Sequence, residues 1–349
     1  MRRSVTGASF LRVAIVFVPA LVFPLIVGAG GAWIVNIGLF TVMYAGLASA
    51  WNLIGGYTGY ITLGNVGFFG LGAYGFAEVF QHVGVGGGWW PFALMPAIAL
   101  VVALVSVPLG WIAFRTRALS FIIVTVVLVV VLQYLAMNLT SLTGGAAGLG
   151  IPVPRFSTGS FVDIFYYAMV VCFALTIAAC WYTRSSRLGL MMVAVREDED
   201  RASGIGINTA VPKLLAFALS AGFSALIGMV WAYYLSTIYP SFAFDAEFTT
   251  MAIVLIAFLG GVGTLWGPTV GALILVPAQQ YLAFTLGAND YYLIGYAAVF
   301  AVVMLTLRRG VVPSVNDLVL RRRRRHAGRL DLAPRPEPRP PVPAGSVPS

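Results

Sequence analysis

ALSFIIVTVVLVVVLQYLAMN, residues 118–138, contains no charged side chain, and the uncharged run continues to Pro154. A helix that crosses the hydrocarbon core of a bilayer, about 30 Å thick, needs about 20 such residues. A strand of a membrane barrel would alternate apolar and polar residues over about 10-residue segments, and Ile122 to Leu132 do not alternate. The stretch therefore predicts a membrane-spanning helix and an all-α integral membrane protein.

Similar apolar stretches fill most of the chain. Hydrophobic residues make up 60% of the sequence and charged residues 9%, whereas a soluble domain carries about a quarter charged residues. This composition excludes a soluble domain and favours a polytopic helical bundle. We expect full spans near residues 13–29, 33–54, 63–80, 91–114, 119–138, 161–182, 213–235 and 291–307.

A further apolar stretch, residues 248–286, is longer than one span and is interrupted by GGVGTLWGP at residues 260–268. It is better interpreted as a broken-helix hairpin or two short helices than as one span. The hairpin either is re-entrant or crosses the membrane twice, which gives eight full spans plus a hairpin, or ten spans. Both alternatives stay open at the level of the sequence.

Arginine and lysine concentrate in cytoplasmic loops of membrane proteins. With the expected helices, their clusters all fall on one side, which predicts an N-in, C-in topology. We therefore expect a cytoplasmic N-terminus at 1–12, a transmembrane domain at 13–309 with a cytoplasmic loop at 184–212, and a tail at 310–349. The tail is basic and rich in proline, so it is expected to be disordered and to lie against anionic lipid, with no nucleic-acid partner.

Glycine-rich breaks occur in both halves of the membrane domain. Glycine lowers helix propensity by about 1 kcal/mol relative to alanine, and irregular backbone at membrane depth must be covered by protein or line a water cavity. Paired breaks of this kind point to a substrate pathway in transporters. The alternative is that the glycines only permit close helix packing. The candidate pathway residues are Gly59, Tyr60, Thr62, Gly64, Asn65, Gly260, Gly261 and Gly263.

The loop at 184–212 is long for a chain whose other loops are short, and it includes an expected amphipathic helix. Such a segment favours docking of a partner outside the membrane. The alternative is a solvated face with ion pairs four residues apart, such as Glu197 with Arg201. The candidate docking residues are Arg196, Glu197, Asp198, Arg201, Ala202, Gly204 and Gly206.

Five ordered motifs together resemble a known family. They are residues 59–74, LTGG at 142–145 with GLGIP at 148–152, residues 189–207, KLLAF at 213–217 and GGVGTLWGP at 260–268. The chain resembles the permease subunits of branched-chain amino acid ABC importers, of the LivM type. The motifs extend over about residues 55–275, most of the membrane body.

The resemblance implies that residues 196–206 form the coupling helix that fits a groove of a cytoplasmic ATPase, with Ala202 and Gly204 at the close-contact turn. It implies four partners for the chain: a second permease subunit, two ATPase subunits and an extracytoplasmic solute-binding protein that faces residues 143–160. ATP hydrolysis would belong to the partner, in keeping with the absence of a G-x-x-x-x-G-K-[ST] loop. The chain itself is expected to be no enzyme, to need no cofactor or metal, and to reside in a bacterial inner membrane.

The substrate stays open. Family members commonly carry glutamine, serine and histidine where this chain has Tyr60, Thr62 and Asn65, and related permeases move urea, amides and aromatic acids. A different class, an ion-coupled secondary transporter, would need buried carboxylates along the spans. Such carboxylates are nearly absent from the sequence, which argues against that class.

Overall fold

The computed structural model describes residues 7–27, 31–83, 88–116, 118–153, 156, 161–286, 301 and 310–315. Most of these residues are helical, as the apolar stretches predict. Within the described part of the chain, six helices are long and apolar enough to cross a membrane: Ala32–Ile54, Trp90–Ala113, Leu119–Asn138, Phe161–Ser185, Ala210–Leu235 and Pro240–Gly260. The chain is thus an all-helical membrane protein.

The helices and strands divide into two halves along the chain. The first half contains α1 (Gly7–Val27), α2 (Ala32–Ile54), α3 (Asn65–Val83), α4 (Trp90–Ala113), α5 (Ala118–Asn138), α6 (Thr140–Thr143), the 3-10 turn η1 (Gly145–Ala147) and β1 (Leu149–Gly150). The second half contains α7 (Phe161–Ser185), α8 (Arg187–Glu197), α9 (Glu199–Gly204), α10 (Ala210–Leu235), β2 (Thr237–Ile238), α11 (Pro240–Ala243), α12 (Phe248–Gly260) and α13 (Gly267–Leu286).

The expected helix bounds agree with the structure to within a few residues for most spans. The stretch 248–286 consists of two helices, α12 and α13, joined at Gly261–Trp266. This agrees with the prediction of a hairpin or two short helices. The span expected at 291–307 and nearly all of the basic tail lie outside the described residues.

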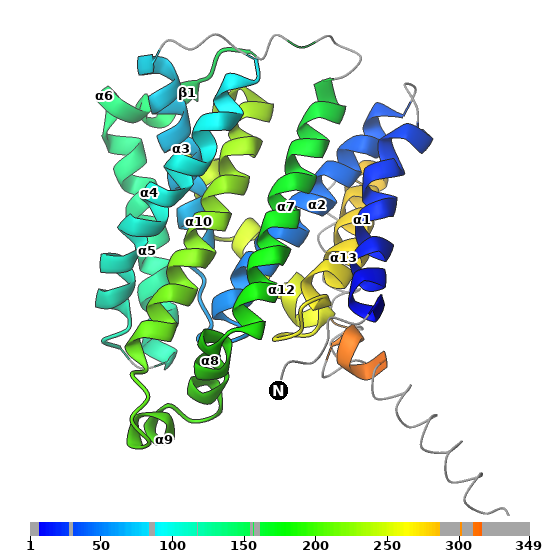
Figure 1. Cartoon of the computed structure of the whole chain (residues 1–349). Helices are drawn as coiled ribbons and strands as arrows, with labels where there is room; N and C mark the ends of the chain where they lie inside the picture. Colours follow the sequence, from blue (N-terminus) through cyan, green and yellow to red (C-terminus); the bar gives the residue numbers. More distant parts are fainter. Residues whose placement is uncertain are drawn as a thin grey trace, which may run out of the picture.

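The helix α10 packs most extensively against α3 and α4, and α2 packs against α7 and α13 (Figure 1). Two glycines allow α3 and α10 to approach closely. A Cβ on Gly72 would lie 2.4 Å from the carbonyl oxygen of Ala225, and one on Gly228 would lie 2.2 Å from that of Phe69. These two glycines therefore serve helix packing, the role of small residues in membrane bundles.

The two ends of the bundle carry different structures. The short helices α8 and α9 lie together at one end, and the small sheet lies at the other (Figure 1). In that sheet β1 pairs antiparallel with β2, so that Leu149 faces Ile238 and Gly150 faces Thr237. The described part of the loop expected to face a binding protein is thus at the end opposite the expected coupling segment.

Candidate functional site

The loop at 184–212 contains two helices rather than one. We expected a single coupling helix over residues 196–206, and the structure corrects this: α8 ends at Glu197 and α9 begins at Glu199. Asp198 separates them because its backbone is extended (φ −166°, ψ 107°) and its Oδ1 accepts a hydrogen bond from the Arg201 amide at 3.0 Å. Asp198 therefore caps the N-terminus of α9, a role that aspartate fills well.

Arg201 forms its ion pair with Asp198, with its Nε 2.8 Å from Oδ2, rather than with Glu197. Most of the candidate docking residues are exposed, but Ala202 is only 3% exposed and packs within the chain. Gly204 is exposed, and a Cβ built there meets no atom within 4 Å. The free surface of α9 thus includes Arg201 and Gly204 and excludes Ala202, and the exposed Gly206 follows the end of the helix.

The first glycine break, residues 55–64, separates α2 from α3 as predicted. Its backbone is held by side chains from two neighbouring helices. The Trp51 indole nitrogen donates to the carbonyl oxygen of Thr62 at 2.7 Å, and the Leu63 amide donates to Thr125 Oγ1 at 3.2 Å. Two backbone groups at the end of the irregular segment, next to α3, are therefore satisfied by side chains of the protein.

Two candidate pathway side chains of this break are buried. Thr62 is 0% exposed and its Oγ1 accepts from the Gly64 amide at 3.0 Å. Asn65 is 2% exposed and its Nδ2 donates to Ser220 Oγ at 2.9 Å and to Ser224 Oγ at 3.1 Å. These contacts fix the start of α3 against α10, and whether either residue lines a pathway stays a prediction.

The second break, at Gly261–Trp266, lies beside the first. Gly261 (φ 115°) and Gly263 (φ 81°) adopt backbone conformations that favour glycine. The side chain of Asn52, at the end of α2, joins the breaks: its Nδ2 donates to the Thr264 carbonyl at 2.9 Å, and its Oδ1 accepts from the Gly263 amide at 2.8 Å. The two breaks singled out in the sequence thus form one structure.

Arg196, the residue before the last of α8, connects the loop to both breaks. Its Nη1 donates to the carbonyl oxygen of Gly56 at 2.5 Å. A Cβ on Gly263 would lie 2.2 Å from that nitrogen, and a Cβ on Gly59, whose φ is 78°, would lie 3.0 Å from Arg196 Cγ. The arginine therefore occupies space that glycines on both breaks leave open.

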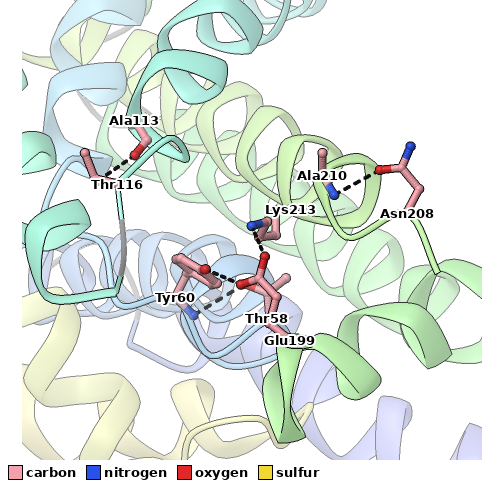
Figure 2. Close-up of polar contacts among 8 residues, drawn as sticks. All are labelled: Thr58, Tyr60, Ala113, Thr116, Glu199, Asn208, Ala210 and Lys213. Carbon is pink, nitrogen blue, oxygen red and sulfur yellow. Dashed lines mark hydrogen bonds and ion pairs between the residues drawn. The ribbon is translucent and has the colours of Figure 1, made fainter. Parts of the chain in front are cut away.

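A second connection runs from α9 to the first break and to α10. The Glu199 carboxylate accepts from the Tyr60 hydroxyl and pairs with Lys213 Nζ (Figure 2). The Lys213 side chain is 6% exposed and that of Glu199 is 31% exposed. Burial raises the pKa of Glu199, but the hydrogen bonds from Lys213 and Tyr60 and the Lys213 charge outweigh it and hold that pKa below its ordinary value.

Aromatic rings surround this ion pair. The Tyr60 ring meets Phe114 and Phe121 edge to face, at centroid distances of 5.5 and 5.4 Å. Lys213 Nζ lies 4.9 Å from the Tyr60 ring centroid and 5.4 Å from that of Phe114. Such contacts stabilise a desolvated ammonium group. Within the residues that the structure describes, no group of three or more His, Cys, Asp or Glu side chains could hold a metal ion.

Known proteins are similar to this chain over most of its length. Residues 33–308 match the family described as "Branched-chain amino acid transport system / permease component". The chain belongs to this permease family. The permease is 26% identical to the high-affinity branched-chain amino acid transport permease LivM of Escherichia coli K12, over 89% of this chain and 80% of that protein.

Two further relatives are more distant. The permease is 25% identical to LivH of Escherichia coli K12, over 77% of this chain and 91% of that protein. It is also 25% identical to the ribose import permease RbsC of Haemophilus influenzae, over 61% of this chain and 68% of that protein. No solved structure matches the chain significantly. Family membership and the long apolar helices identify a multi-pass inner-membrane protein.

Three side chains of this permease site were missing from the residues chosen by sequence: Asn52, Glu199 and Lys213. Lys213 had a readable signal, since it is a lone lysine at the start of a long apolar segment. A buried lysine needs a partner, and Glu199 in the nearby loop supplies it. Asn52 had no comparable signal, because its two partners are more than 200 residues away in the sequence.

Proposed function

We propose that this permease is the membrane subunit of an ABC importer for branched-chain amino acids. Its family, and the printed names of the LivM and LivH relatives, support the substrate class. Because both relatives belong to branched-chain amino acid transport, we also propose pairing with a second, related permease subunit. Two cytoplasmic ATPase subunits and an extracytoplasmic binding protein complete the proposed assembly.

In this proposal the end of the bundle that carries α8 and α9 is cytoplasmic, with both termini on that side, and the β1–β2 end faces the binding protein. The clusters of arginine and lysine in the sequence support this orientation. The exposed face of α9 around Gly204 would enter the groove of the ATPase. Open space at Gly204 supports a close approach of the partner backbone there.

The observation that carries the proposal is the position of Arg196 between the two glycine breaks. When ATP binding moves the docked loop, Arg196 would pull on Gly56 and Gly263 together, and Glu199 would pull on Tyr60 and Lys213. Coupling of two sites requires a contiguous element with two arrangements, and these contacts provide the connection. The candidate residues from Gly59 to Asn65 and from Gly260 to Gly263 would then change the pathway from closed to open.

The test is uptake by the purified assembly. The tagged chain would be co-expressed with its partners, purified in mild detergent and reconstituted into vesicles, and uptake of labelled leucine would be measured with and without ATP. We expect ATP-dependent uptake that excess isoleucine and valine inhibit. Inhibition only by urea, short amides or aromatic acids would change the substrate. Uptake by the chain alone, driven by an ion gradient, would contradict the importer and support a secondary transporter.

A further inference from the structure

A long apolar cavity of about 840 Å³ lies between α4 and α7, over the surface of α10. Its rims are large side chains, including Leu100 and Leu104 of α4 and Val171 and Leu175 of α7. Its floor includes small residues of α10, among them Ala218 and Gly222. The lining is almost wholly apolar, so the occupant must be a hydrocarbon chain or an apolar protein surface.

The floor of the cavity favours a flexible chain over a helix. The lining residues of α4 extend from Trp89 to Val107, or about 27 Å at 1.5 Å per residue. The small residues that would draw in another helix are already used, because a Cβ on Gly222 would lie 3.2 Å from Ala103 Cβ of α4.

Beyond the end of the cavity, the face of α4 that lines it continues to a polar pair. Trp111 and Arg115 follow Leu104 and Val107 at spacings of three and four residues, so all four lie on one face of the α4 segment. The Arg115 guanidinium lies 4.2 Å from the centroid of the exposed Trp111 ring. Among the described residues, no carboxylate lies within ion-pair distance of Arg115.

Arg115 also lies at the α9 end of the bundle, because its neighbour Phe114 contacts Lys213. Tryptophan is enriched at the interface between bilayer and water, and arginine binds phosphate with two parallel hydrogen bonds. An apolar cavity that leads to this pair matches one kind of ligand, a molecule with long hydrocarbon chains and a single anionic phosphate.

We propose that this cavity binds one anionic phospholipid, with its acyl chains between α4 and α7 and its phosphate on Arg115. The bound lipid would fill the gap between two helices that have no extensive direct contact, and so hold α4 and α7 at a fixed separation against α10. Such a site differs from the contacts that the protein makes with the surrounding bulk lipid, because both the apolar cavity and the phosphate contact select its occupant.

The experiment is native mass spectrometry of the full chain in mild detergent, titrated with phosphatidylglycerol and, separately, with phosphatidylethanolamine. The variants are Arg115→Ala, Arg115→Lys and the cavity-filling Ala218→Trp. Arg187→Ala is the matched control, since Arg187 is exposed at the same end of the bundle and lies outside the cavity.

We expect one phosphatidylglycerol per wild-type chain and a weaker response to phosphatidylethanolamine. Arg115→Ala should weaken phosphatidylglycerol binding about fivefold, as expected for one basic residue near an anionic lipid, whereas Arg115→Lys and Arg187→Ala should retain it. Ala218→Trp should weaken binding of both lipids. Equal binding by wild type and Arg115→Ala would overturn the proposal. So would efficient crosslinking of Leu104→Cys to a second permease subunit in membranes, because protein would then cover the cavity.

Discussion

Arg196 Nη1 donates a hydrogen bond of 2.5 Å to the carbonyl oxygen of Gly56, 140 residues earlier in the chain. The same guanidinium fills the space beside Gly263, where a Cβ would lie 2.2 Å away. One side chain thus contacts both irregular segments of the membrane domain from a loop outside it. This contact gives the proposed coupling a structural path, and several consequences of it can be measured.

The first prediction concerns Gly263. Gly263→Ala should destabilise the protein by at least about 1 to 2 kcal/mol, because its φ of 81° costs that much for an L residue and the new methyl group would displace Arg196. Thermal unfolding in detergent measures the effect. Gly204→Ala is the control and should be neutral or stabilising, since that glycine is helical with open space around it. Equal unfolding midpoints for the two variants would contradict this interpretation.

The second prediction concerns the ion pair between Glu199 and Lys213, next to Tyr60. Glu199→Gln should lower the free energy of unfolding by about 1 to 2 kcal/mol, because it leaves the buried Lys213 ammonium without its counter-charge. The exposed pair of α9 is the comparison: Arg201→Ala should cost no more than about 0.5 kcal/mol, since the Arg201 side chain is 88% exposed. A larger loss from Arg201→Ala than from Glu199→Gln would contradict the assignment.

The third prediction is a pH dependence. The folded protein holds the pKa of Glu199 below its ordinary value of 4.5, so this carboxylate stabilises the fold above about pH 4.5. That stability is lost as the pH falls through the lowered pKa. The gap in unfolding midpoint between wild type and Glu199→Gln should therefore be constant from pH 7 to about pH 5 and should narrow below pH 4.5. A gap that widens in acid would show that the charged form is not the stabilising one.

The fourth prediction separates docking from folding. Gly204→Glu should prevent co-purification of the ATPase while leaving abundance and unfolding midpoint unchanged, because the added side chain enters open space on α9. Ala202→Arg is expected to behave differently: Ala202 is 3% exposed, so the variant should lose stability as well as its partner. Full ATPase recovery with Gly204→Glu would place the docking surface elsewhere.

The long helices could be predicted from the sequence because an uncharged run is a local property, and residues 118–138 show it plainly. The breaks could also be predicted, because glycine at such density opposes a helix. The division of the coupling segment was missed although its signal was present. Asp198 followed by Glu199 and Asp200 is typical of a helix start, whereas the prediction placed all three inside one helix.

The contacts that join the segments could not be predicted. Asn52 lies 211 and 212 residues from its two partners, and Glu199 lies 139 residues from Tyr60. No periodicity or composition encodes such pairs, because they depend on how the helices pack in three dimensions. The sequence indicates a pathway role for Gly59 and Gly263, and the structure gives both a further role, making room for Arg196.

The most direct test of the account is the ratio of leucine uptake to ATP hydrolysis in vesicles that contain the whole assembly. Wild type, Arg196→Ala and the exposed control Arg187→Ala, at the start of the same helix α8, would be compared at equal protein content. We predict that Arg196→Ala keeps its ATPase partner and its hydrolysis but lowers the ratio about tenfold, a typical coupling energy, while Arg187→Ala preserves the ratio. An unchanged ratio in Arg196→Ala, with the assembly intact, would contradict coupling through the contact between Arg196 and the two glycine breaks.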